Sequence, residues 1–301
     1  MNEQCLYGAI EGGGTKFVCA VARSPSEILE SAVIGTRDAA ATLNECVTFF
    51  ANAQQRHGAI AAFGFSCFGP LDLRPESAGY GRMMATPKPG WSRADVVGPL
   101  RHAFDVPIAL DTDVAGAALA EWQLGAGRGC GSLAYVTVGT GIGAAVVPQP
   151  AAPLMHAEMG HIPVRRHPRD GDFKGLCPFH ADCLEGLASG PTILDRWGTT
   201  LDALPEDHEC FSILASYLGQ LAAVIALTHS VERIVFGGGV MANPALIAHV
   251  RSWTSGYLNG YLEPLNDADR WERYICSPAL GHRAGLTGSV LLAMSARQRE
   301  R

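Results

Sequence analysis

The chain has 301 residues, of which 48% are hydrophobic and 17% charged, with a formal net charge of −6 and a pI near 5.9. This composition excludes a disordered protein, and the acidic balance gives no reason to expect nucleic acid as a partner. The N-terminus has no basic start followed by an apolar run, and the longest charge-free segment, 129–155, carries five glycines and three prolines. We therefore expect neither a signal peptide nor a membrane span.

Strand and helix signals alternate along the chain. The predicted strands cover residues 6–10, 16–22, 60–65, 107–110, 133–138, 144–147 and 233–236. The predicted helices cover residues 43–50, 93–104, 114–124, 211–231 and 284–297, with a further helix opened by Asn243 as N-cap and Pro244. The predicted loops and irregular segments are 79–91, 148–153 and 156–185. This alternation predicts an α/β fold.

Two glycine turns, each between two predicted strands, form a weak internal repeat. The first is Glu11-Gly-Gly-Gly-Thr15, and the second, about half the chain later, is Gly139-Thr-Gly-Ile-Gly143. Glycines let backbone N–H groups approach a phosphate, although the first turn has neither Walker nor Rossmann spacing. A lone glycine hairpin is more often purely structural. The presence of a second copy gives the structural and the phosphate-binding interpretations about equal weight.

Asp113 follows the predicted strand 107–110 and comes directly before the helix 114–124. A carboxylate at the carboxyl end of a strand faces the crevice where α/β proteins bind ligands, so Asp113 could be a general base. The same position suits the N-cap of the helix, and the physical chemistry of the sequence alone favours the N-cap.

The segment Cys177-Pro-Phe-His180-Ala-Asp-Cys183 carries the strongest local signal. Together with His161 it offers four N and S donors, which close a tetrahedral shell and predict a structural zinc site. The alternative is chance spacing in a histidine-rich loop, but such a Gly- and Pro-rich loop has little else to fold it. Glu158 and Glu185 bracket the loop and could bind hydroxyls, or could be ordinary solvated carboxylates. The nine cysteines are otherwise scattered, which favours thiols in the reducing cytoplasm.

Taken together, these segments resemble the ROK family of sugar kinases, and within it the bacterial fructokinase-like branch. Seven segments match in the family's order: GAIEGGGTKFVCAV, ALDTDVAGAALAEW, TVGTGIGAA, EMGH, CPFHADCLEGLASGP, FGGGVMANPAL and AGLTGS. The resemblance covers nearly the whole chain and implies a two-domain actin-like ATPase (ribonuclease H-like) α/β fold with a cleft between the domains. We expect residues 1–112 with 285–301 to form one domain and residues 113–284 the other.

The resemblance also implies roles for individual residues. Asp113 would be the catalytic base that takes the proton from the attacking sugar hydroxyl. The candidate sugar contacts are Glu158, His161, Glu185, Gly69 and Pro70. The zinc ligands would be His161, Cys177, His180 and Cys183. ATP would be bound on its phosphate side by Gly12, Gly13, Gly14, Thr15, Lys16, Gly139, Thr140, Gly141 and Gly143, and on its adenosine side by Gly237, Gly238 and Gly239.

The implied activity is phosphorylation of a hexose by ATP with Mg²⁺, most simply of D-fructose to fructose 6-phosphate. A glucokinase, mannokinase or N-acetylhexosamine kinase, or a non-catalytic sugar sensor, stays open as an alternative. Thr112 and Ala115 depart from the Asn that many members carry; the first fits the DTD form of the fructokinase branch. No helix-turn-helix segment precedes the first motif, so the family's repressors match poorly. A homodimer without nucleic-acid or membrane partners is the family-based expectation.

Overall fold

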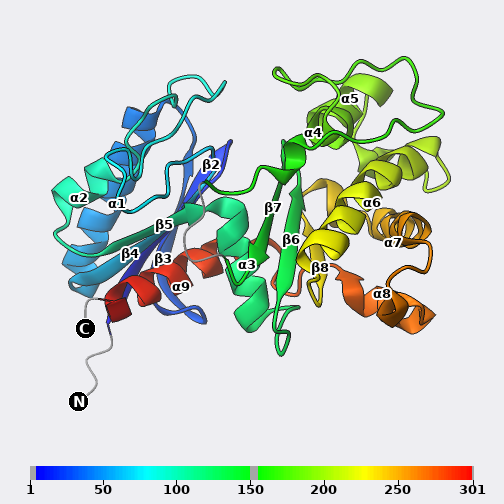
Figure 1. Cartoon of the computed structure of the whole chain (residues 1–301). Coiled ribbons are helices and arrows are strands. Elements are labelled where there is room, and N and C mark those ends of the chain that lie inside the picture. The colour runs from blue at the N-terminus through cyan, green and yellow to red at the C-terminus, as the bar shows by residue number, and fades with distance from the viewer. Residues whose placement is uncertain (1–4, 150–154, 300–301) are drawn as a thin grey trace. The chain divides into compact units, whose positions relative to one another are not determined.

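The computed structural model describes residues 5–149 and 155–299, which leaves most of the predicted loop 148–153 outside the described residues (Figure 1). Contacts divide the chain into two compact units. Unit 1 comprises the described parts of 1–120, 149–156 and 283–301, and unit 2 comprises 121–148 and 157–282. The domain boundaries implied by the family resemblance stay a prediction.

Unit 1 is built on a five-stranded sheet with the order β3-β2-β1-β4-β5. Its strands are β1 (Leu6–Gly12), β2 (Lys16–Ser24), β3 (Glu27–Gly35), β4 (Ile60–Cys67) and β5 (Ile108–Thr112). Strands β1 to β3 pair antiparallel, whereas β1, β4 and β5 run parallel. The predicted strands of this unit are confirmed. Strand β3 was not predicted, because it is an edge strand that is mostly exposed and therefore shows no clear apolar alternation.

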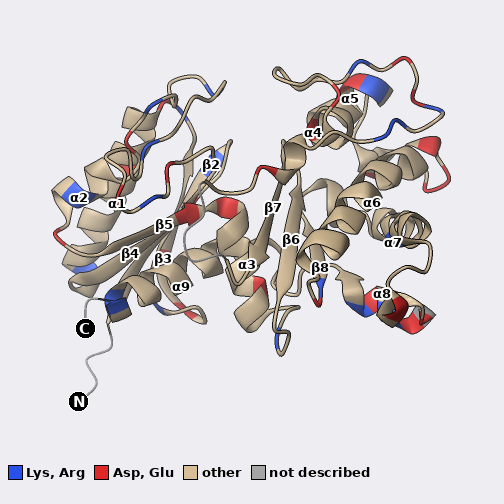
Figure 2. Ribbon diagram, viewed as in Figure 1, with Lys and Arg blue, Asp and Glu red and all other residues tan. Residues whose placement is uncertain are grey.

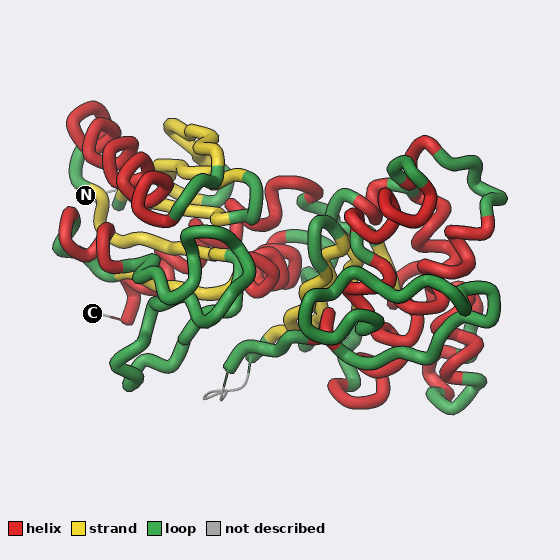
Figure 3. The backbone as a smooth tube through the Cα atoms, turned by 90° about the horizontal axis from the view of Figure 1, so that it is seen from above, coloured by secondary structure: helices red, strands yellow, loops and turns green. Residues whose placement is uncertain are grey.

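The two faces of this sheet carry different helices (Figures 1 and 3). Helix α1 (Ala39–His57) packs on the face that presents Phe17 and Phe63. Helix α9 (Ala284–Arg299) packs on small residues, since a Cβ at Gly64 would lie 1.9 Å from the carbonyl oxygen of Ser289. The Ser289 hydroxyl donates to the Ile10 carbonyl at 2.8 Å. Helix α9 is therefore held directly against β1 and β4.

The helix predicted over 93–104 is wrong in its first half. Helix α2 covers only Gly98–Ala103, and Arg93 has a left-handed φ of 66° that no helix allows. Pro99 lies in the first turn, where its missing N–H costs nothing, so the helix begins beside it. Asp95 accepts a hydrogen bond from the Gly98 N–H at 2.8 Å and stabilises the bend before the helix.

Unit 2 contains a four-stranded sheet with the order β7-β6-β8-β9. Its strands are β6 (Leu133–Val138), β7 (Ile142–Val147), β8 (Ile234–Gly237) and β9 (Ile275–Cys276). Strands β6 and β7 are antiparallel and the others parallel, which repeats the order and direction of β2-β1-β4-β5. The internal repeat expected from the two glycine turns is therefore confirmed as a repeat of topology.

Helices α6 (Glu209–His229) and α7 (Pro244–Leu258) form the core of unit 2 with this sheet. The smaller helices of this unit are α4 (Leu184–Ala188), α5 (Gly190–Trp197) and α8 (Ala268–Tyr274). Helix α3 (Asp113–Leu124) begins in unit 1 and ends in unit 2. Among the described residues, α6 alone is long and apolar enough to cross a membrane, but 78% of that stretch is buried, as in a core helix.

Candidate functional site

The first candidate site lies at the carboxyl edge of the unit 1 sheet. Gly12 of β1 is paired with Cys67 of β4, and Cys67 with Thr112 of β5, so the three parallel strands end level with one another. The chain leaves these ends as the first glycine turn, as the segment leading to Gly69 and Pro70, and as Asp113. The register therefore brings together the predicted phosphate turn, two candidate sugar contacts and the candidate base.

Asp113 is the first residue of α3 and not its cap. The Thr112 hydroxyl accepts a hydrogen bond from the Ala115 N–H at 3.2 Å, which is the capping contact of a helix N-terminus. The Asp113 carboxylate accepts from the adjacent Val114 N–H at 2.8 Å. The N-cap interpretation of Asp113 is therefore wrong. Thr112, which stands where many family members carry Asn, caps the helix instead and leaves the Asp113 carboxylate available to a ligand. Ala115 is buried against the core.

Three acidic residues lie where β1 and β5 end: Glu11 in β1, Asp111 in β5 and Asp113 directly after β5. Figure 2 shows acidic positions at the end of β5 and the start of α3. Burial raises the pKa of Asp113 above its usual range, and burial also raises the pKa of Asp111 to about 6. Burial, followed by the charge of Asp113, raises the pKa of Glu11 to about 7, against smaller lowering contributions from Lys16 and the Leu286 backbone. Carboxylates tuned toward neutral pH are suited to proton transfer or to holding a cation.

Glu11 was not among the predicted site residues, although it belongs to the first motif. A Cβ at Gly285 would lie 2.2 Å from the Glu11 carboxylate, so a larger residue at the start of α9 would displace this side chain. A Cβ at Gly288 would lie 2.0 Å from the carbonyl oxygen of Gly116 in α3. The AGLTGS segment thus makes room for Glu11 and for α3. The sequence signal that could have identified Glu11 is its position at the head of the first glycine turn.

The second glycine turn and the Gly237–Gly239 segment lie together in unit 2. Within the turn, the Gly139 N–H donates to the Gly141 carbonyl at 2.9 Å. The Gly139 carbonyl in turn accepts from Gly190 at the start of α5, at 2.7 Å. Gly238 has a φ of 92°, and a Cβ there would lie 2.3 Å from the carbonyl oxygen of Val138. Only glycine can therefore bring the end of β8 this close to the turn.

The predicted nucleotide-binding glycines are of two kinds. A Cβ at Gly14, Gly139 or Gly239 would meet no atom within 4 Å. In contrast, a Cβ at Gly12 or Gly237 would collide with side chains that pack against it. The open glycines are the places where a ligand could approach the backbone, and the crowded ones hold the turns in shape. It stays a prediction that these glycines bind ATP. The same holds for Thr15, Lys16, Thr140 and Gly143.

The four predicted metal ligands converge in unit 2. His161, from the 3₁₀ turn Met159–His161, presents Nδ1 at 3.5 Å from the Cys183 sulfur and 3.7 Å from the Cys177 sulfur. His180 Nδ1 lies 3.6 Å from Cys177 Sγ, and all four donor atoms lie within 4.8 Å of one another. Zinc bonds of about 2.3 Å to sulfur and 2.0–2.1 Å to nitrogen give S···N edges of about 3.6 Å in a tetrahedron. The residues therefore fit a zinc ion.

Glu185 connects this donor set with the second glycine turn. One carboxylate oxygen accepts from the Ile142 N–H at 2.8 Å, and the other lies 3.9 Å from His161 Nε2, the nitrogen facing away from the thiols. A Cβ at Gly160 would lie 1.8 Å from the Ile142 carbonyl, so the turn carrying exposed Glu158 also packs closely on β7. The candidate sugar contacts of this unit therefore surround one end of β7.

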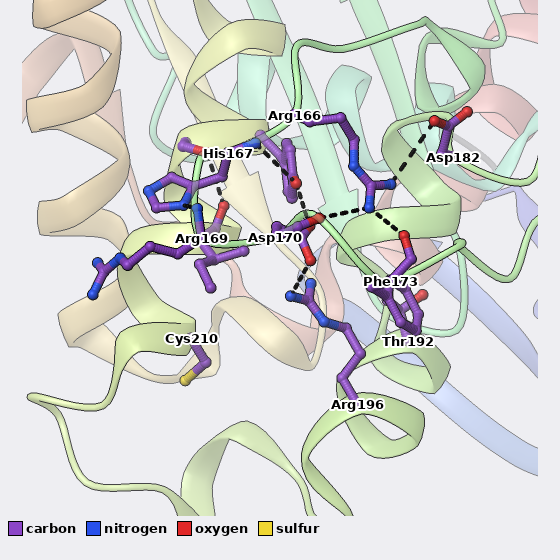
Figure 4. A network of polar contacts seen from close by, with 12 residues as sticks. Arg166, His167, Arg169, Asp170, Phe173, Asp182, Thr192, Arg196 and Cys210 are labelled. Atoms are coloured by element: carbon purple, nitrogen blue, oxygen red, sulfur yellow. Dashed lines mark hydrogen bonds and ion pairs between the residues drawn. The ribbon is translucent and has the colours of Figure 1, made fainter.

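A buried polar network supports residues 163–176, the segment between the candidate ligands His161 and Cys177 (Figure 4). The Asp170 carboxylate accepts from Arg196 of α5 at 2.5 Å and from the Tyr217 hydroxyl of α6. Arg166 donates to the carbonyl oxygen of Asp170 at 2.7 Å and lies 3.8 Å from Asp182 of the metal loop. The expectation that this long loop has little but a metal to fold it is therefore wrong for residues 163–176.

The Glu185 carboxylate is expected to position both the second glycine turn and the His161 ring. Glu185→Ala should therefore weaken Mg·ADP binding and lower activity by ~10–100-fold. Glu185→Gln keeps an oxygen for the Ile142 N–H and should bind Mg·ADP nearly as well as the wild-type protein. Calorimetric titration of both variants measures this. Equal nucleotide affinity in Glu185→Ala and wild type would show that the carboxylate does not position the turn.

The shared strand order of the two units, each with a glycine turn between its first two strands, defines the class of protein. It is a two-domain α/β protein of the actin-like ATPase (ribonuclease H-like) fold, as predicted. The ROK family model matches residues 7–296, and the chain belongs to that family.

Relatives of known name agree with this assignment. The chain is 44% identical to a fructokinase from Zymomonas mobilis, over 98% of both chains. It is 36% identical to a putative fructokinase from Bacillus subtilis, over 98% of this chain and 97% of that protein. Among solved structures, a ROK hexokinase from Thermus thermophilus has a TM-score of 0.74 and 25% identity, and the similarity covers 98% of this chain and 99% of that one.

Proposed function

We propose that this protein is a sugar kinase that transfers the terminal phosphoryl group of ATP to D-fructose and forms fructose 6-phosphate. The observation that carries the choice of sugar is the 44% identity, over 98% of both chains, to the fructokinase of Zymomonas mobilis. The carboxyl edge of unit 1 supports the reaction type. It brings Asp113, which does not cap its helix and has a raised pKa, beside a glycine turn.

In this proposal Asp113 takes the proton from the attacking hydroxyl of the sugar. Glu158, His161 and Glu185 hold other hydroxyls, as do the loop residues Gly69 and Pro70. The open glycines of both turns bind the phosphates of ATP through backbone N–H groups.

Two metal ions have places in the proposal. Mg²⁺ bound with ATP would supply positive charge to the phosphates, and Glu11 offers the carboxylate oxygens that this ion prefers. Zinc held by His161, Cys177, His180 and Cys183 would fix the position of the His161 ring. We also propose that the protein acts in the cytoplasm as a homodimer.

A panel of hexoses with Mg·ATP, assayed by coupled ADP release, tests the function. We expect kcat/KM to be highest for D-fructose, and the product should be the 6-phosphate. A higher kcat/KM for glucose, mannose or an N-acetylhexosamine would move the assignment to another kinase of the family. Sugar binding without ADP release from any sugar would mean that the protein is a non-catalytic sensor.

A further inference from the structure

The loop 79–91, which none of the assignments above uses, carries Lys88, whose side chain reaches the first glycine turn. The Lys88 ammonium donates a hydrogen bond to the Gly14 carbonyl at 2.5 Å. An ammonium has three N–H donors, and the structure shows no other partner for it within residues 5–149 and 155–299. Two donors therefore remain for a ligand at the turn.

The turn itself is arranged to bind an anion. Its carbonyl groups are held by other residues, since Thr36 donates its hydroxyl to the Gly13 carbonyl at 2.9 Å and its N–H to the Thr15 carbonyl at 3.0 Å. No acceptor for the N–H groups of Gly14 and Thr15 occurs among the described residues. A Cβ at Gly14 would meet nothing within 4 Å. The turn thus has unpaired N–H donors, open space and an adjacent cation.

The position of Lys88 is fixed by the loop that carries it. Trp91, three residues after Lys88, is fully buried, and its ring stacks on that of Phe17 with the ring centroids 5.3 Å apart. Phe17 is the second residue of β2. The Trp91 indole donates to the Arg37 carbonyl at 2.7 Å, and its backbone N–H donates to the Lys88 carbonyl at 3.2 Å. This anchor ties the loop to the strand that leaves the turn, so Lys88 is held over the turn by packing.

The choice of residue at this position agrees with phosphate binding. Of the 23 basic residues in the chain only three are lysines, and two of these, Lys16 and Lys88, lie at the first glycine turn. A lysine presents a compact point charge that suits a single phosphate oxygen, whereas arginine binds through a planar fork.

We propose that Lys88 is a catalytic residue that binds the transferred phosphoryl group together with the N–H groups of the turn. The proposal rests on the proposed function, because Asp113 and the turn lie at the same edge of unit 1, and the phosphate nearest to the base is the one that moves. The phosphoryl group leaves the nucleotide and becomes bonded to the sugar oxygen, while the hydroxyl proton passes to Asp113. Lys88 balances the negative charge of the group in transit.

The test compares Lys88→Met with two controls. Thr36→Val removes one tether of the turn without changing its charge, and Lys174→Met removes the charge of an exposed lysine in unit 2. We expect Lys88→Met to lower kcat by ~10²–10³-fold and to weaken binding of a non-hydrolysable ATP analogue at least ~10-fold more than binding of ADP. Lys88→Arg should recover part of the analogue binding, and Lys174→Met should match the wild-type protein.

Nucleotide binding is measured by calorimetry without sugar, with the melting temperature as the check on folding. Equal loss of ATP-analogue and ADP binding in Lys88→Met, or the same pattern in Thr36→Val, would overturn the proposal and leave Lys88 as a structural tether. A wild-type protein that phosphorylates no hexose would refute the proposed function separately, because the binding comparison needs no turnover.

Discussion

Replacing Asp113 with Asn is expected to lower kcat for fructose phosphorylation by ~10²–10⁴-fold, the usual contribution of a general base. The change should not unfold the protein, because Thr112 and not Asp113 caps α3. The Asn side chain keeps an oxygen that can accept from the Val114 N–H, as the carboxylate does at 2.8 Å. Melting temperature and Mg·ADP affinity should therefore stay close to those of the wild-type protein.

Asp111 provides a matched control, because it is also a half-buried acid with a raised pKa and lies only two residues away. Its carboxylate accepts from the Thr112 N–H at 2.8 Å and from the Gln149 side chain at 3.3 Å, so it is engaged within its own strand and neighbouring segment. We expect Asp111→Asn to change kcat far less than Asp113→Asn. Full activity of Asp113→Asn would show that the base is another residue.

The pH dependence follows from the same residues. A base must be ionised, and burial raises the pKa of Asp113, so kcat/KM should fall as the pH drops through this raised value. Glu11, whose pKa is raised to about 7, is coupled to Asp113 by charge. The acidic limb of the wild-type profile therefore belongs to the pair, and Asp113→Asn should reduce it to a single titration.

Local patterns in the sequence were sufficient to predict most elements that carry the site. Helical spacing at Leu43 and Phe50 corresponds to α1, and Asn243 caps α7 by accepting from the Ala245 N–H, as predicted. The two glycine turns predicted a repeat that appears as a shared strand order. These features depend on residues close together in the chain, and that is why single-sequence reasoning reached them.

Other features depend on pairs of residues far apart in the chain, which a single sequence does not reveal. The cap of α3 is a local exception: the sequence favoured Asp113, and only the direction of the Thr112 hydroxyl shows that Thr112 is the cap. Glu11 meets Gly285 across most of the chain length, and Lys88 meets Gly14 from a loop whose composition indicates only irregular structure. The support of residues 163–176 by Asp170 and Arg196 likewise joins separate segments.

Replacing Cys177 with Ser should abolish zinc binding and lower kinase activity. Removing only the hydrogen-bond partner of a metal ligand costs ~10–100-fold, and losing a ligand itself should cost more than this. The physical reason is that four donors within 4.8 Å of one another repel or desolvate each other unless an ion joins them. His161 belongs to this set and also faces Glu185, so a free ring would disturb the proposed sugar contacts.

The damage should be confined to the metal loop, because Asp170 and Arg196 hold residues 163–176 independently of the thiols. We therefore expect Cys177→Ser to unfold at a lower temperature and to be cut by protease within residues 174–185, with the remaining chain intact. Cys130→Ser, which changes a cysteine outside the donor set, is the matched control and should retain zinc and activity.

Elemental analysis of gently purified protein should give one zinc per chain. Absence of zinc there, or normal folding with unchanged activity in Cys177→Ser, would contradict the assignment, since the convergence of the four donors would then have to be maintained by protein packing alone.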